Sequence, residues 1–168
     1  MYLFLNKLYH IIPIFTSLML TLIFSFNTGE VYSSYYSPSI AAICVYYWVF
    51  NYPRLISVVD IFFVALISDF INQTPIGTET ISLLLTYFFT ISQKDVVVKY
   101  GFTFFWCYLA YFLLIYTLIK FAILSLYFFE ININQNLIAQ YTITFLLYPL
   151  LHKILSYIGL KKTVNLEL

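Results

Sequence analysis

Charged residues are scarce in this chain. Of its 168 residues, 9% are Asp, Glu, Lys or Arg, whereas 62% are hydrophobic. A soluble globular domain is roughly a quarter charged, so this composition cannot cover a domain with a water-facing surface. The mean hydropathy is +0.91, which predicts that lipid is the main solvent. Clustered Lys and Arg are also missing, and we therefore expect no nucleic-acid partner.

Residue types that commonly build catalytic and metal sites are equally few. The chain has two cysteines, Cys44 and Cys107, inside apolar runs, and two histidines, His10 and His152. We interpret the cysteines as small packing residues, because no CxxC pattern or disulfide framework is present. No HExxH motif, phosphate-binding loop or nucleophile motif accompanies the histidines. We therefore expect no enzymatic activity, no catalytic residues, no metal and no cofactor.

What the chain does contain is long apolar runs. Six of them cover residues 11–26, 39–52, 55–71, 79–92, 102–128 and 137–158. A helix needs about 20 residues to cross a bilayer, so the second and fourth runs are short. The runs do not alternate as barrel strands do, and no cleavage site follows the first, which we interpret as an uncleaved span. The sequence predicts an all-α polytopic membrane bundle of about six transmembrane helices, with residues 1–168 in a single domain.

Charge placement predicts the orientation. With six spans, the N-terminus and every second loop share one side. That side holds all basic residues but one, namely Lys7, Arg54, Lys94, Lys99, Lys153, Lys161 and Lys162. The opposite loops hold Glu30, Glu79 and Glu130. By the positive-inside rule, both termini are expected in the cytoplasm.

Three charges, Asp60, Asp69 and Lys120, are expected inside the hydrocarbon or at its edge. Such charges usually face the bundle interior. The two aspartates are about two and a half helical turns apart, so they point to opposite faces and cannot share a site. For Lys120 we keep two alternatives, an ion pair with Asp69 or a lone lysine that snorkels to the membrane surface. For Asp60, a buried polar residue, the alternatives are a partner at Lys153 or His152, or a hydrogen bond elsewhere in the bundle.

Proline and glycine mark the turns between spans. Pro53 in "NYPR" is expected to end the second helix and let the third begin at once. Pro75 and Gly77 in "NQTPIGTET" are expected to separate the third helix from the fourth, which Thr78 can cap with its hydroxyl. Pro149 should kink the last span.

The segment "YYWVFNYPRLISVVDIFFVALISDFINQTPIGTETISLLL" resembles the MreD family of bacterial rod shape-determining membrane proteins. The family's motif positions are occupied in order and at matching spacing by Tyr47, Trp48, Pro53, Asp69 and Gly77. One departure is "ALIS" before Asp69, where the family commonly has Gly and Leu.

The resemblance implies a non-catalytic subunit of the cell-shape and peptidoglycan elongation machinery in the bacterial inner membrane. It implies an MreC-like protein as closest partner, with MreB, RodA and a class B penicillin-binding protein in the wider complex. The family is also similar in fold to the substrate-binding S components of energy-coupling-factor vitamin transporters, and such a component is the alternative function.

From these patterns we hypothesise two groups of site residues. A groove rim for a partner helix or a lipid is expected at Asp69, Pro75, Gly77 and Lys120. Helix turns and packing are expected to depend on Tyr47, Trp48, Pro53 and Pro149. The carboxylate of Asp69 is then satisfied either by the rim of the bundle or by a partner helix.

Overall fold

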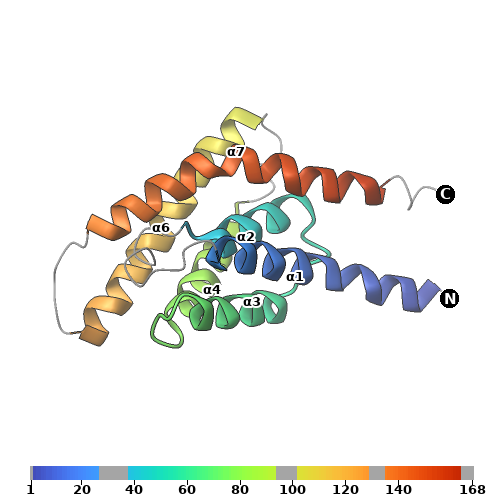
Figure 1. Cartoon of the computed structure of the whole chain (residues 1–168). Helices are drawn as coiled ribbons and strands as arrows, with labels where there is room; N and C mark the ends of the chain where they lie inside the picture. The colour runs from blue at the N-terminus through green and yellow to red at the C-terminus, as the bar shows by residue number, and fades with distance from the viewer. Residues whose placement is uncertain (1, 27–37, 94–101, 129–134, 164–168) are drawn as a thin grey trace.

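The computed structural model describes residues 2–26, 38–93, 102–128 and 135–163, and the side chains of 11–24, 38–93, 103–127 and 137–159. Over these residues the fold is all-α, as predicted. The helices, labelled as in Figure 1, are α1 (Tyr2–Phe26), α2 (Ile40–Asn51), α3 (Val58–Ile71), α4 (Thr78–Ile91), α6 (Phe102–Phe128) and α7 (Gln135–Thr163). The loops that carry Glu30, Lys94, Lys99 and Glu130 lie outside the described residues.

Helix α2 is the centre of the bundle. It packs against α1, α3, α4, α6 and α7, and each of its residues from Ile40 to Phe50 is buried. Figure 1 shows it between α1, the α3–α4 pair, α6 and α7. A helix that is apolar on every side suits a position with protein on every side. With 12 residues, α2 is only about 18 Å long.

The remaining helices pack in pairs around α2. Helix α3 contacts α4 and α1, and α6 contacts α4 and α7. In Figure 1, the start of α1 and the end of α7 point toward the same side of the view, away from the end of α6 and the start of α7. Helix α7 changes direction along its length in this view, and Pro149 stands at its middle. The bend agrees with the predicted kink, because proline removes a backbone hydrogen bond from a helix.

The turn between α2 and α3 differs in part from the prediction. Helix α2 ends at Asn51, before Pro53 as expected, but α3 begins only at Val58. The delay has a local cause. The Ser57 amide donates to Asp60 Oδ2 at 2.7 Å, and the Asp60 amide donates to Ser57 Oγ at 3.3 Å. This capping box fixes the helix start. Asp60 is half-buried, so its predicted burial is wrong. Its partner is the nearby Ser57 rather than Lys153 or His152 on α7.

Aromatic side chains fill the core around the C-terminal half of α2. This aromatic cluster consists of Tyr46, Tyr47, Trp48, Phe50, Phe105, Tyr148 and His152. Tyr46 donates to the Phe105 carbonyl at 2.7 Å, which ties α2 to α6. Tyr47 and Trp48 are both buried and their rings meet edge to face, 5.5 Å apart. The predicted packing role of Tyr47 and Trp48 agrees with this position.

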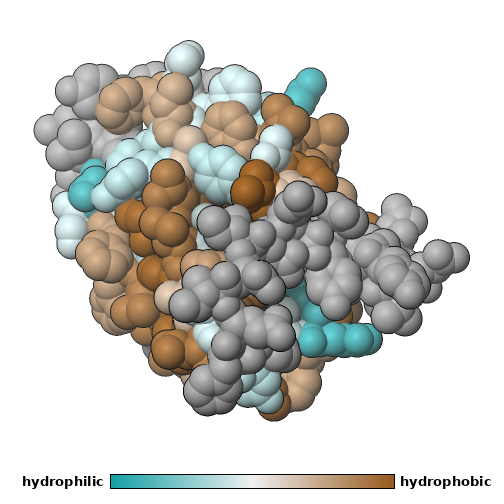
Figure 2. All heavy atoms as spheres, turned by 90° about the vertical axis from the view of Figure 1, so that its left-hand side faces the viewer, coloured by the Kyte–Doolittle hydropathy of each residue, from teal (hydrophilic) through white to brown (hydrophobic). Residues whose placement is uncertain are grey.

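The outer surface of the bundle is apolar. Large hydrophobic side chains are exposed on every helix with described side chains except the enclosed α2, for example Phe15, Phe63, Leu85, Leu118 and Ile154. Figure 2 shows brown, hydrophobic side chains spread over much of one face. Among the described residues, one helical segment, Thr103–Tyr127, is long and apolar enough by itself to cross a membrane, and Ile11–Phe24, Ile40–Asn51 and Thr78–Ile91 are shorter apolar helical segments.

Candidate functional site

Asp69 lies near the end of α3 and is fully buried. Its carboxylate accepts hydrogen bonds from the first turn of α4 and the turn before it. The donors are the amides of Gly77 (3.0 Å), Glu79 (2.8 Å) and Thr80 (3.3 Å) and the hydroxyls of Thr74 (2.8 Å) and Thr80 (2.9 Å). The first amides of a helix have no intrahelical acceptor and favour a negative charge. Of the two sequence alternatives, the rim of the bundle therefore satisfies Asp69.

The turn between α3 and α4 has the geometry that Pro75 and Gly77 predict. Gly77 is the N-cap of α4 and has a φ of 101°, a left-handed conformation that glycine adopts without strain. The Thr78 amide donates to the Pro75 carbonyl at 3.0 Å. The predicted cap from Thr78 is wrong, because its buried hydroxyl has no hydrogen-bond partner and Asp69 reaches the helix start instead.

Lys120 forms an ion pair with Glu79. The distance between Nζ and Glu79 Oε1 is 2.5 Å, and the exposed fractions of the two side chains are 5% and 0%. Lys120 also donates to Gln140 Oε1 of α7 at 3.2 Å, and Tyr116 donates to the second carboxylate oxygen of Glu79. Both sequence alternatives for Lys120 were wrong, since it neither pairs with Asp69 nor reaches the surface. Glu79, predicted in a loop, is a buried residue of α4.

A buried polar network around this ion pair joins α3, α4, α6 and α7 to the N-cap residue of α2. It consists of Ser39, Asp69, Glu79, Tyr116, Lys120, Gln140 and Thr144. Ser39 Oγ and Tyr116 Oη are 2.8 Å apart, and the Ser39 amide donates to Thr144 Oγ1 at 3.0 Å. Removing one partner of a buried ion pair costs about 3–5 kcal/mol, because the other charge stays buried without compensation. Arrangements that separate these helices at the N-terminal end of α2 would therefore be disfavoured.

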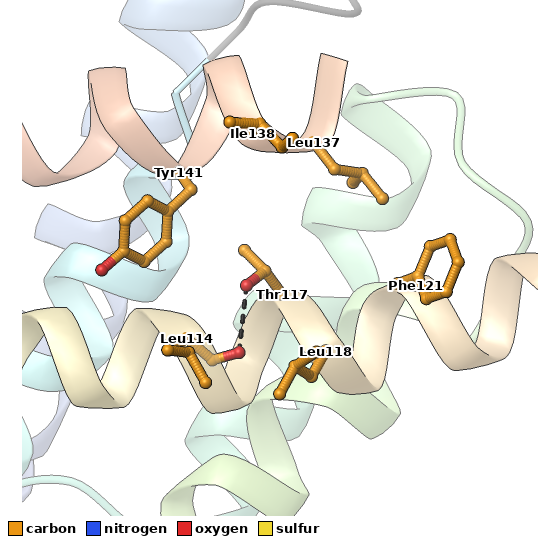
Figure 3. A pocket seen from close by; sticks show the side chains of 7 residues that line it. All are labelled: Leu114, Thr117, Leu118, Phe121, Leu137, Ile138 and Tyr141. Atoms are coloured by element: carbon orange, nitrogen blue, oxygen red, sulfur yellow. Dashed lines mark hydrogen bonds between the residues drawn. The ribbon is translucent and has the colours of Figure 1, made fainter. Parts of the chain in front are cut away.

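An open apolar groove of about 410 Å³ lies between α6 and α7. Figure 3 shows the side chains that line it, which are Leu114, Thr117, Leu118 and Phe121 on α6 and Leu137, Ile138 and Tyr141 on α7. The two hydroxyl groups that line the groove already donate hydrogen bonds within the protein. Thr117 donates to the Leu114 carbonyl at 3.0 Å, and Tyr141 donates to the Ala110 carbonyl at 3.2 Å. The groove consequently suits an apolar occupant. The groove rim predicted at Asp69, Pro75, Gly77 and Lys120 lies elsewhere, because Asp69 and Lys120 are buried and none of the four residues lines this groove.

Sequence reasoning missed Glu79, Tyr116 and Gln140. One signal was available, because Tyr116 and Lys120 are four residues apart and such residues share a helix face.

Among the described residues, no group of three or more His, Cys, Asp or Glu side chains could hold a metal ion. Cys44 is buried and Cys107 is exposed. No protein-family model, curated protein or solved structure matches the chain.

Proposed function

We propose that the protein is a non-catalytic, multi-pass membrane subunit whose helices are held together by buried polar contacts. The observation that carries this proposal is that three charged side chains are buried while large apolar side chains cover the outside of the bundle. Asp69, Glu79 and Lys120 are buried, while side chains such as Phe63 and Leu118 are exposed. In lipid there is no hydrophobic driving force between helices, and close packing, small residues and polar contacts hold them together. Helix α4 follows this pattern, since its buried face includes Thr78, Ser82, Thr86 and Thr90.

We propose six crossings of a bilayer, of which three are made by helices long enough to span it alone. Helices α1, α6 and α7 have 25, 27 and 29 residues, which gives each about 37 Å or more. Helices α2, α3 and α4 are shorter than the roughly 30 Å hydrocarbon core. The short helix α2 is enclosed by protein. Where α3 ends, the backbone amides of Gly77, Glu79 and Thr80 donate hydrogen bonds to Asp69. Non-helical backbone is tolerated at membrane depth where protein satisfies it.

For the orientation we propose that both termini are cytoplasmic. Support comes from the basic residues on one side of the predicted topology and from α1 and α7, whose ends point to the same side in Figure 1. Exposed Arg54 and Lys153 belong to the proposed cytoplasmic side. The α3–α4 turn then faces the outside of the bacterial inner membrane.

Within this class, we propose a scaffold of the MreD kind in the peptidoglycan elongation machinery. Its partners would be an MreC-like protein, with MreB, RodA and a class B penicillin-binding protein in the wider complex. Support comes from the positions of the motif residues, which lie in the two turns or in the core. Pro53 lies in the α2–α3 turn, and Asp69 and Gly77 build the α3–α4 turn.

The scaffold needs a surface for its partner, and Asp69 is not part of that surface because it is buried. We place the contact at the groove between α6 and α7, which would take one apolar transmembrane helix of the MreC-like protein. A Leu118→Trp variant would fill the groove, whereas Leu85→Trp adds the same bulk to an exposed position on α4. Both leucines are exposed, at 58% and 43%.

Co-purification from membranes tests this function. We expect the parent chain and Leu85→Trp to recover the MreC-like protein and the cell-wall synthases, and Leu118→Trp to recover several-fold less. Recovery of an ATPase-coupled module with a bound solute would contradict the scaffold and favour the S component. Equal recovery by both Trp variants would contradict the placement of the contact at the groove but not the scaffold function. Adjacency of the gene to an MreC-like gene is a simple additional check.

A further inference from the structure

We infer that Lys120 supplies the counter-ion that keeps α4 in the membrane, so that the α3–α4 hairpin reaches its stable position only after α6 has inserted. The inference rests on the proposed membrane function. Its starting point is a mismatch of charge within the hairpin. Residues 55–91 include two fully buried carboxylates, Asp69 and Glu79, and no lysine or arginine.

The two carboxylates differ in the origin of their hydrogen-bond donors. All donors to Asp69 belong to the hairpin itself, as the amides of Gly77 and Glu79 illustrate. The side-chain donors to Glu79 are Lys120 and Tyr116, and both belong to α6. The hairpin can therefore satisfy Asp69 when it forms, but it cannot neutralise Glu79.

Helix α6 carries both side chains that donate to the Glu79 carboxylate. Tyr116 and Lys120 lie one helical turn apart, and the Lys120 ammonium is 5.8 Å from the centre of the Tyr116 ring. Gln140 on α7 accepts a further hydrogen bond from Lys120. The segment Thr103–Tyr127 is long and apolar enough to insert by itself, and long apolar segments tolerate a single lysine.

Chain order then determines the sequence of events. Glu79 precedes Lys120 by 41 residues, so α4 is synthesised before its counter-ion exists. Helix α4 has 14 residues, with Glu79 in its first turn, and it is too short to be a stable span alone. Pairing with Lys120 removes the isolated charge and holds the α3–α4 turn on the outer side.

The test labels the α3–α4 turn from outside in the full-length chain. Cys44 and Cys107 are replaced by alanine, and Ile76→Cys is introduced in the turn, where Ile76 is 71% exposed. Spheroplasts are treated with a membrane-impermeant maleimide. We expect strong labelling in this parent and at least about tenfold less after Lys120→Met, because Glu79 is then unpaired. Adding Glu79→Gln to Lys120→Met should restore labelling to within about twofold.

Lys153→Met is the matched control, because Lys153 is an exposed lysine on α7 and its loss should leave labelling unchanged. Parent-level labelling in Lys120→Met would overturn the inference while the proposed function stands. If Lys120→Met is instead degraded, the double variant must recover the protein, and failure to do so overturns the inference too. A parent labelled only after permeabilisation contradicts the proposed orientation, and the inference fails with it.

Discussion

The two ends of α2 are held in different ways. At its N-terminal end, Ser39 joins a network of charged and hydroxyl side chains around the Glu79–Lys120 ion pair. At its C-terminal end, Tyr46 and Trp48 lie among aromatic rings. Buried charges require particular partners, whereas aromatic rings contribute mainly contact area and shape. The comparison indicates that the polar end selects the arrangement of the helices and that the aromatic end adds to its stability.

The largest effect is expected from breaking the ion pair. Lys120→Met should lower the free energy of unfolding by about 3–5 kcal/mol, because Glu79 would stay buried without its counter-ion. Thermal unfolding of the detergent-solubilised protein measures this change. The double variant with Glu79→Gln should recover most of the loss. Additive losses from the two substitutions would show that the two residues do not act as a pair.

The next effect is expected at Asp69. Asp69→Asn keeps the shape but removes the charge that accepts bonds from the Gly77, Glu79 and Thr80 amides. We expect a loss of about 2–3 kcal/mol, since hydrogen bonds to a buried charge are strong. Asp60→Asn is the control, because its capping box is partly exposed and should cost about 1 kcal/mol or less. Equal losses at the two positions would argue against a special role for burial.

A smaller effect is expected at the aromatic end, where α7 passes close to Tyr52. A Cβ atom on Gly159 would lie 2.7 Å from the Tyr52 hydroxyl oxygen. Gly159→Ala should therefore cost about 1–2 kcal/mol through overpacking, measured by the same thermal unfolding. Adding Tyr52→Phe removes the nearest atom and should return part of the loss. No change in Gly159→Ala would mean that the aromatic end adapts more easily than we expect.

The smallest effect is expected for a single hydroxyl of the aromatic cluster. Tyr148→Phe removes the contact of the phenol with His152 Nδ1, at 3.1 Å, and keeps the ring. The expected loss is about 0.5–1 kcal/mol. The matched substitution in the network, Tyr116→Phe, removes a donor to the Glu79 carboxylate and should cost about 1.5–3 kcal/mol. If Tyr148→Phe proves the more harmful, the contrast between the two ends is wrong.

Much of the fold follows from the sequence, because the breaks between helices have chemical causes. Pro53 ends α2, and Pro75 and Gly77 separate α3 from α4. The late start of α3 was missed, although Ser57 and Asp60 have the spacing of a capping box. The partner of Lys120 was missed because only charges within the apolar runs were compared, and Glu79 was assigned to a loop.

The central position of α2 could not be predicted. Several helices of this chain are apolar on all sides, so no amphipathic stripe shows which face is inside. The order of the helices around α2 depends instead on long-range polar contacts such as Ser39 with Tyr116. Such contacts join residues far apart in the sequence and leave no local pattern.

The accessibility of the outer surface to lipid tests the central claim most directly. Nitroxide labels are placed at the exposed positions Phe63, Leu85 and Leu118, and at the buried position Thr86 for comparison, in the cysteine-free protein reconstituted in bilayers. We predict that the three exposed positions collide often with oxygen, which dissolves in lipid, and rarely with a water-soluble nickel complex, and that Thr86 is shielded from both. Frequent collisions of the nickel complex with all three exposed positions would contradict a membrane-spanning bundle.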